Sequence, residues 1–179
     1  MPSIRLAELH PIIVHFPIAL LLASVALDTM AAIFKRATLI EGATWTLLLG
    51  TPGAVAALAS GWLSEHDVSV GAADSLLHWH KVCAVTATII FGTLFLLRLL
   101  WQSPRILGWA RVALPRAGGV ATAQTWWRSV LPLAYVRPLP RGLVVAYLAL
   151  SVIGVVMLAL TGYLGGAIVY DHGVGLPLR

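Results

Sequence analysis

The sequence predicts an all-α integral membrane protein whose four transmembrane helices form a bundle. The chain has 179 residues, of which only 11% are charged, and its mean hydropathy of +0.90 is too high for a soluble domain of this size. Four apolar runs approach or exceed the roughly 20 residues that cross a bilayer, and none shows the period-two alternation of a transmembrane strand. The runs are Pro11–Phe34, Ala43–Leu63, Leu76–Trp101 and Gly142–Tyr170.

The first run is longer than the core of a signal peptide, and Arg5 is the only base before it, so we interpret it as an uncleaved span. Its helix is expected to begin at Pro11, because proline fits the first helical position, where its missing N–H costs nothing. His10 then lies at the mouth of the bundle, and His15 lies one turn inside, on the stripe that faces the interior. The two rings are about 140° apart around the helix axis, so they cannot share one ligand plane.

Basic residues gather on one side of the predicted bundle. By the positive-inside rule this side is cytoplasmic, so we expect both termini outside. Residues 1–179 are interpreted as one membrane domain, in which residues 102–141 form a cytoplasmic connection between the third and fourth helices. That connection mixes arginine with tryptophan, which is typical of interfacial helices on an anionic leaflet. The bases on this side are Lys35, Arg36, Arg98, Arg105, Arg111, Arg116, Arg128, Arg137 and Arg141.

Several functions are excluded or disfavoured. The bases adjoin the spans, where they serve topology, so the pI of about 10.0 does not indicate a nucleic-acid partner. Cys83 is the only cysteine, which excludes an internal disulfide and a cysteine-based zinc site. No catalytic triad order, nucleotide loop or Cys/His redox motif occurs, so no catalytic residue or enzyme class is predicted. Transport is disfavoured because Asp28 is the only acid well inside a span, and we expect it to cap a helix or pair with Arg98 near the inner surface.

All six histidines fall on the outer side of the predicted bundle. An ionisable ring at membrane depth is costly unless it binds or hydrogen-bonds something, so these residues are candidates for a site. His78 and His80 are about 200° apart on the third helix. We assign His80 to the interior, beside small residues, and His78, next to Trp79, to the interfacial aromatic belt. His172 follows the last span, where glycines turn the chain over the bundle mouth.

The second and fourth spans each carry a stripe of small residues. Such a stripe admits either a neighbouring backbone or a flat ligand, and the sequence leaves both interpretations open. Gly162 and Gly166 also form a GxxxG pair. The stripes consist of Gly50, Gly53, Ala54, Ala57, Ser60 and Gly61 in the second span, and of Ser151, Gly154, Thr161, Gly162 and Gly165 in the fourth.

Three features carry a family resemblance: LHPIIVHFPIALL at the start, a histidine that opens the third span, and GYLGGAIVYDHGVG at the end. With these motifs the chain resembles the bacterial multi-pass inner-membrane proteins catalogued as domain of unknown function 2231. The resemblance covers the four spans but not the connection rich in Arg and Trp. It implies a location in the bacterial inner membrane, and it favours electron transfer, because family members resemble, and are sometimes joined to, Rieske or cytochrome c domains.

Our leading hypothesis is a membrane subunit that carries b-type haem. Haem needs two axial donors on facing elements and a slot for its planar ring, and His15 and His80 are expected to supply the donors at the periplasmic side. Its electron partner would be a quinol or a periplasmic cytochrome, beside other membrane redox subunits. His10 and His172 form a second candidate pair, for another haem or a transition metal at the water boundary.

The alternative is a cofactor-free structural or accessory subunit of a larger membrane complex. There, His15 and His80 hydrogen-bond each other, a carbonyl or water, and tie the outer ends of the helices together. Interhelical hydrogen bonds worth about 0.6 to 2 kcal/mol would then explain these histidines without a ligand.

Overall fold

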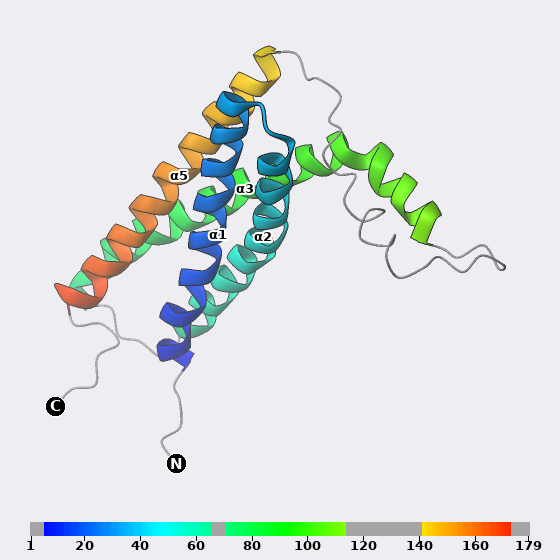
Figure 1. Ribbon diagram of the computed structural model, residues 1–179. Helices are drawn as coiled ribbons and strands as arrows, with labels where there is room; N and C mark the ends of the chain where they lie inside the picture. The colour runs from blue at the N-terminus through cyan, green and yellow to red at the C-terminus, as the bar shows by residue number, and fades with distance from the viewer. Residues whose placement is uncertain (1–5, 66–70, 114–140, 173–179) are drawn as a thin grey trace.

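The computed structural model describes residues 6–65, 71–113 and 141–172, and within these ranges the chain is helical with no strands. The elements are α1 (Leu6–Phe34), α2 (Ala37–Glu65), the 3-10 turn η1 (Gly71–Ala73), α3 (Asp74–Ala113) and α5 (Arg141–Tyr170). The four long helices alternate in direction, so the start of α1 and the end of α5 lie at the same end of the bundle (Figure 1). The predicted all-α fold is confirmed.

Each long helix contains a segment that is long and apolar enough to cross a membrane. Large apolar side chains are more than half exposed on all four helices, for example Ile12, Leu49, Ile89 and Val152. So much exposed apolar surface is unusual on a soluble monomer, whereas contact with lipid accounts for it. The chain is therefore a multi-pass membrane protein, as predicted. The segments are His10–Phe34, Thr38–Glu65, Asp74–Leu100 and Arg141–Tyr170.

The bundle is built from two helix pairs. The first hairpin is α1 with α2, the second hairpin is α3 with α5, and contact within each hairpin is far more extensive than contact between them. Buried side chains from the middle of the helices join the two hairpins. This core consists of Leu21, Leu47, Ala54, Ala87, Phe91, Leu94 and Leu158.

Two helix ends differ from the prediction. α1 begins at Leu6 and not at Pro11, which lies inside the helix, because a proline within a membrane helix is tolerated once neighbouring groups satisfy the freed carbonyl. The apolar part of α3 ends at Leu100, as predicted, but the helix itself continues to Ala113 and leaves the bundle (Figure 1). The first part of the predicted interfacial connection is therefore an extension of α3, and residues 114–140 lie outside the described residues.

A buried arginine ties the four helices together near the end opposite the start of α1. Arg98 of α3 is only 2% exposed. Its Nη2 atom donates to Oδ2 of Asp28 on α1 at 2.5 Å and to the hydroxyl of Tyr147 on α5 at 2.9 Å. Its Nη1 atom donates to Oγ1 of Thr44 on α2 at 2.9 Å. The expected pairing of Asp28 with Arg98 is confirmed, and Arg98 is thus a buried structural group and not a loop charge.

Candidate functional site

A cavity of about 540 Å³ lies between the two hairpins, at the end of the bundle where α1 and α3 begin and α2 and α5 end. We call this the histidine end. All four long helices line the cavity, whose volume is in the range of small-molecule and cofactor sites. Most of the wall is apolar, and its titratable members are His10, His15, Glu65, His80, Lys81 and Tyr170.

The ring of His10 is held by α2, the other helix of the first hairpin. Its Nδ1 atom lies 2.9 Å from Oγ of Ser60. Ser60 donates its own hydroxyl hydrogen to the carbonyl of Ala57 at 2.8 Å, so its oxygen accepts the N–H of the ring. The ring also lies close to Gly61, where an added Cβ would be 3.0 Å from Cε1 of His10. The neighbouring helix therefore fixes both the position and the tautomer of His10.

The ring of His80 is held in the same way by α5, the other helix of the second hairpin. Its Nδ1 atom donates to the carbonyl of Thr161 at 2.9 Å. A Cβ added at Gly165 would be 3.1 Å from Cε1 of this ring. The predicted inward orientation of His80 agrees with this geometry, since the ring is half-buried and lines the cavity.

These contacts define the chemistry that the two rings offer. Each Nδ1 faces an acceptor and so carries the proton, which leaves the lone pair on Nε2. No protein group in the described ranges hydrogen-bonds Nε2 of His10 or His80, and both rings line the same cavity. Metal-bound histidines typically show this arrangement, in which the second ring nitrogen donates to a protein oxygen. The cavity therefore receives two neutral imidazole donors, one from each hairpin.

The structure places His10 and His15 differently from the expectation. His15 lines the cavity, but its side chain is exposed and its Nδ1 donates to the carbonyl of Pro11 in its own helix. The expectation that His15 faces the interior while His10 lies at the mouth is therefore wrong. The physical reason is that α1 already begins at Leu6 and that its buried face runs through Pro17, Leu21 and Ser24, the face of His10, which leaves His15 about 140° away from it.

Two other described histidines, His172 and His78, are not brought to this cavity. His172 is exposed, donates from Nδ1 to the carbonyl of Ala167 at 3.3 Å, and is absent from the cavity wall. The suggested pair of His10 and His172 therefore does not converge here. His78 is exposed and contacts Trp79 edge-on with ring centroids 5.8 Å apart. His66 lies outside the described residues.

Both interpretations of the small-residue stripes find support in different parts of the helices. Towards the middle, glycines admit close packing within each hairpin, since a Cβ at Gly50 would be 2.9 Å from Cδ2 of Leu21 and a Cβ at Gly154 would be 2.9 Å from Cε2 of Phe91. Towards the histidine end, the stripes open onto the cavity. Ala54, Ala57, Gly61, Thr161, Gly162 and Gly165 belong to its wall.

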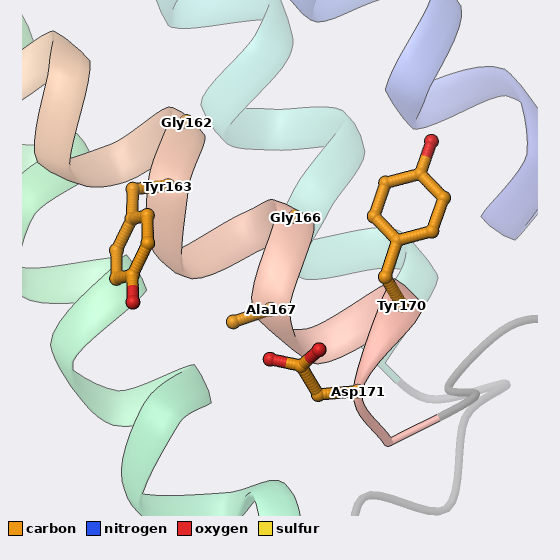
Figure 2. A pocket seen from close by; sticks show the side chains of 6 residues that line it. All are labelled: Gly162, Tyr163, Gly166, Ala167, Tyr170 and Asp171. Atoms are coloured by element: carbon orange, nitrogen blue, oxygen red, sulfur yellow. The ribbon is translucent and has the colours of Figure 1, made fainter.

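A smaller hollow lies on the surface of α5, around the GxxxG pair (Figure 2). Its volume is about 310 Å³, and the exposed rings of Tyr163 and Tyr170 lie on opposite sides of Gly162 and Gly166. Among the described residues, Asp171 is its only carboxylate. The hollow shares both glycines and Tyr170 with the main cavity, and no histidine is found among its described lining residues, so the main cavity remains the candidate site.

Two features of the site carry little signal in the sequence. Ser60 and Thr161 belong to the predicted stripes, but nothing in their local sequence marks them as partners of histidines on other helices. An ion pair between Nζ of Lys81 and Oε1 of Glu65, at 2.7 Å, also joins α3 to α2 beside the cavity. Both features depend on which helices are neighbours, and helix pairing is a property of the whole fold.

The fold and the cavity together define a class: a four-helix membrane protein with paired, oriented histidines between its two hairpins. A family model described as "Predicted membrane protein (DUF2231)" matches residues 7–117, which is more than half of the chain. The chain therefore belongs to this family, as its motifs predicted. The match ends before α5, so the motif GGAIVYDHGVG lies outside it. No curated protein and no solved structure matches the chain.

Proposed function

We propose that this membrane protein holds one b-type haem between His10 and His80 and transfers electrons through it. The observation that carries the proposal is the pair of oriented rings on one cavity, each with Nδ1 engaged and Nε2 available. His10 replaces His15 in the pair expected from the sequence, because His15 is exposed and bonded within its own helix.

The residues of the cavity fit haem in three respects. His10 and His80 would hold the haem from two facing helices, α1 and α3, that line the same cavity. The wall is mostly apolar, which suits the macrocycle, and small residues from α2 and α5 leave space beside the histidines. Lys81 supplies a cation in the wall, where it is paired with Glu65, and a cation there suits the anionic propionate groups of haem.

Two histidine ligands determine the kind of chemistry. Haem held by His10 and His80 would supply one-electron reduction and oxidation of its iron, and two protein ligands would leave no ligand place for oxygen or a substrate. The protein would contribute ligand orientation, through Ser60 and the carbonyl of Thr161, and an apolar environment that sets the reduction potential. Electron transfer is thus favoured over oxygen chemistry.

The location of the site suggests its electron partners. The connection between α1 and α2 carries Lys35 and Arg36, and α5 begins with Arg141, all at the end opposite the cavity. By the positive-inside rule that end is cytoplasmic, which puts the cavity at the periplasmic side of a bacterial inner membrane. There it is accessible to a quinol from the lipid or to a periplasmic cytochrome, and to other membrane redox subunits.

The competing function is a cofactor-free accessory subunit whose histidines join helices. The hydrogen bond between His80 and the Thr161 carbonyl is of the kind that this alternative requires. However, the bonds of His10 and His80 each lie within one hairpin. They do not connect the two hairpins, so a linking role leaves the shared cavity and the free Nε2 atoms without an explanation.

An absorption spectrum of detergent-purified, full-length protein made with ample haem supply tests the proposal. We expect a Soret band and visible bands that sharpen on reduction with dithionite. His10→Ala and His80→Ala should lose these bands, whereas His15→Ala and His78→Ala should keep them. These two controls lie on the same helices and have exposed side chains. A folded but colourless wild-type protein would refute haem binding and favour the accessory role.

A further inference from the structure

The first helix of each hairpin, α1 in one and α3 in the other, has the same spacing between its cavity histidine and its buried charge. His10 and Asp28 are 18 residues apart on α1, and His80 and Arg98 are 18 residues apart on α3. A shift of 70 positions thus superimposes the cavity histidines and also the two members of the buried ion pair. The same shift pairs buried residues of α1 with buried residues of α3: Pro17 with Ala87, Leu21 with Phe91, and Ser24 with Leu94.

The two second helices share a pattern as well, with a shift of 104 positions. It aligns Gly61 with Gly165, the two glycines that contact the histidine rings. It aligns Gly50 with Gly154, the two glycines that pack against Leu21 and Phe91. All four buried residues of α5 fall on buried residues of α2: Ser151 on Leu47, Gly154 on Gly50, Leu158 on Ala54, and Ile168 on Ser64.

The side chains at the matched positions are mostly different, but the contacts are the same. In each hairpin a histidine ring lies against a glycine, and 11 residues deeper a large apolar side chain lies against a second glycine. The carbonyl that accepts from His80 belongs to Thr161, which aligns with Ala57, and the Ala57 carbonyl is linked to His10 through the hydroxyl of Ser60. Helix packing alone repeats buried positions every three or four residues, but it does not require that the histidine–glycine contact and the second glycine contact have the same spacing in both hairpins.

From this correspondence we infer that the protein is built from two versions of one helical hairpin, and that Gly61 and Gly165 are matched positioning residues for the two cavity histidines. Each glycine lets one imidazole lie directly against the neighbouring helix, which sets the plane of the ring and the direction of its Nε2 atom. The ligand role of these rings rests on the proposed function, but their positioning by the glycines does not depend on it.

The repeat also supplies a matched control for each positioning residue. A Cβ at Gly61 or Gly165 would meet a histidine ring at 3.0 or 3.1 Å, whereas a Cβ at Gly50 or Gly154 would meet an apolar side chain at 2.9 Å. Alanine at any of the four sites should therefore crowd a helix contact and lower the stability of the protein. Only alanine at Gly61 or Gly165 should also turn an imidazole plane.

The experiment measures electron paramagnetic resonance spectra and midpoint potentials of the oxidised full-length protein and its variants. The g-values of a low-spin ferric haem with two histidines depend on the angle between the imidazole planes. Gly61→Ala and Gly165→Ala should shift the g-values and the potential, whereas Gly50→Ala and Gly154→Ala should leave the g-values unchanged. If Gly61→Ala does not fold, Ser60→Ala, which removes the acceptor of His10 without adding bulk, should give the shift for the first hairpin.

The outcomes separate the inference from the proposed function. Wild-type g-values in folded, haem-loaded Gly61→Ala and Gly165→Ala would overturn the positioning role while haem binding stands. If the wild type is colourless, haem binding fails, and nitrogen NMR of labelled histidine reads the rings directly. In that case each glycine variant should move the ring signals of its own histidine only, and unmoved signals would overturn the inference.

Discussion

Replacement of Arg98 by methionine tests the buried contact that joins the four helices. The side chains of Arg98 and Asp28 are 3% and 9% exposed, so the substitution leaves a carboxylate in a site that is nearly closed to water. Removing one partner of such a pair destabilises a protein by about 3 to 5 kcal/mol, because the remaining charge has no compensation. The hydrogen bonds to Tyr147 and Thr44 are lost as well, which places the expected loss at the upper part of this range.

The assay is equilibrium unfolding of the detergent-solubilised protein by titration with dodecyl sulfate, followed by circular dichroism. Lys81→Met is the control, because its partner Glu65 is also an ion-pair carboxylate but the two side chains are 35% and 38% exposed. Such a pair contributes about 0.2 to 1 kcal/mol. The double variant Asp28→Asn/Arg98→Met should lose less unfolding free energy than its two single variants lose together, since both substitutions act on one interaction. A loss for Arg98→Met that is no larger than for Lys81→Met would refute the reasoning.

Two further predictions concern packing and interhelical bonding. Gly154→Ala should lower the unfolding free energy by about 1 to 3 kcal/mol, because the added methyl group overpacks against Phe91. Gly162→Ala is the control and should change the unfolding free energy by less than about 1 kcal/mol, because a Cβ at Gly162 meets nothing within 4 Å. Equal losses for the two variants in the same titration would contradict the glycine contacts. Ser24→Ala should lower the unfolding free energy by about 0.6 to 2 kcal/mol, because the buried Ser24 hydroxyl donates to the carbonyl of Ala43 on α2 at 3.0 Å. Thr29→Ala is its control, since the exposed Thr29 hydroxyl bonds within α1, and a thermal melt that does not distinguish the two variants would count against the interhelical bond.

The sequence was sufficient to predict the fold class because the decisive signal is local. A run of about 20 apolar residues must become a helix to satisfy its backbone in lipid, whatever its neighbours are. The pairing of Asp28 with Arg98 was also within reach, because two opposite charges in apolar spans need each other. The start of α1 could not be predicted from the sequence, because the preference of proline for the first turn is weaker than the tendency of an apolar segment to remain helical.

The candidate site could be predicted only in part. The sequence located the histidines at one end of the bundle and selected His80, since its helix face continues into buried residues such as Cys83 and Ala87. The different placements of His10 and His15 could not be predicted, because they depend on which face of α1 is buried and on contact with α2. Helix pairing and register also determine the roles of Ser60 and Gly61, and neither is encoded in a local pattern.

The central claim is that two histidines from different hairpins bind one haem. Near-infrared magnetic circular dichroism of the oxidised, full-length protein tests it most directly, because the position of the charge-transfer band identifies both axial ligands of a low-spin ferric haem. If His10 and His80 are the ligands, the band of paired histidines should be present in the wild type and in His15→Ala, and it should be lost in His10→Ala and His80→Ala. A band from another ligand pair, or one that survives both of the latter substitutions, would contradict it.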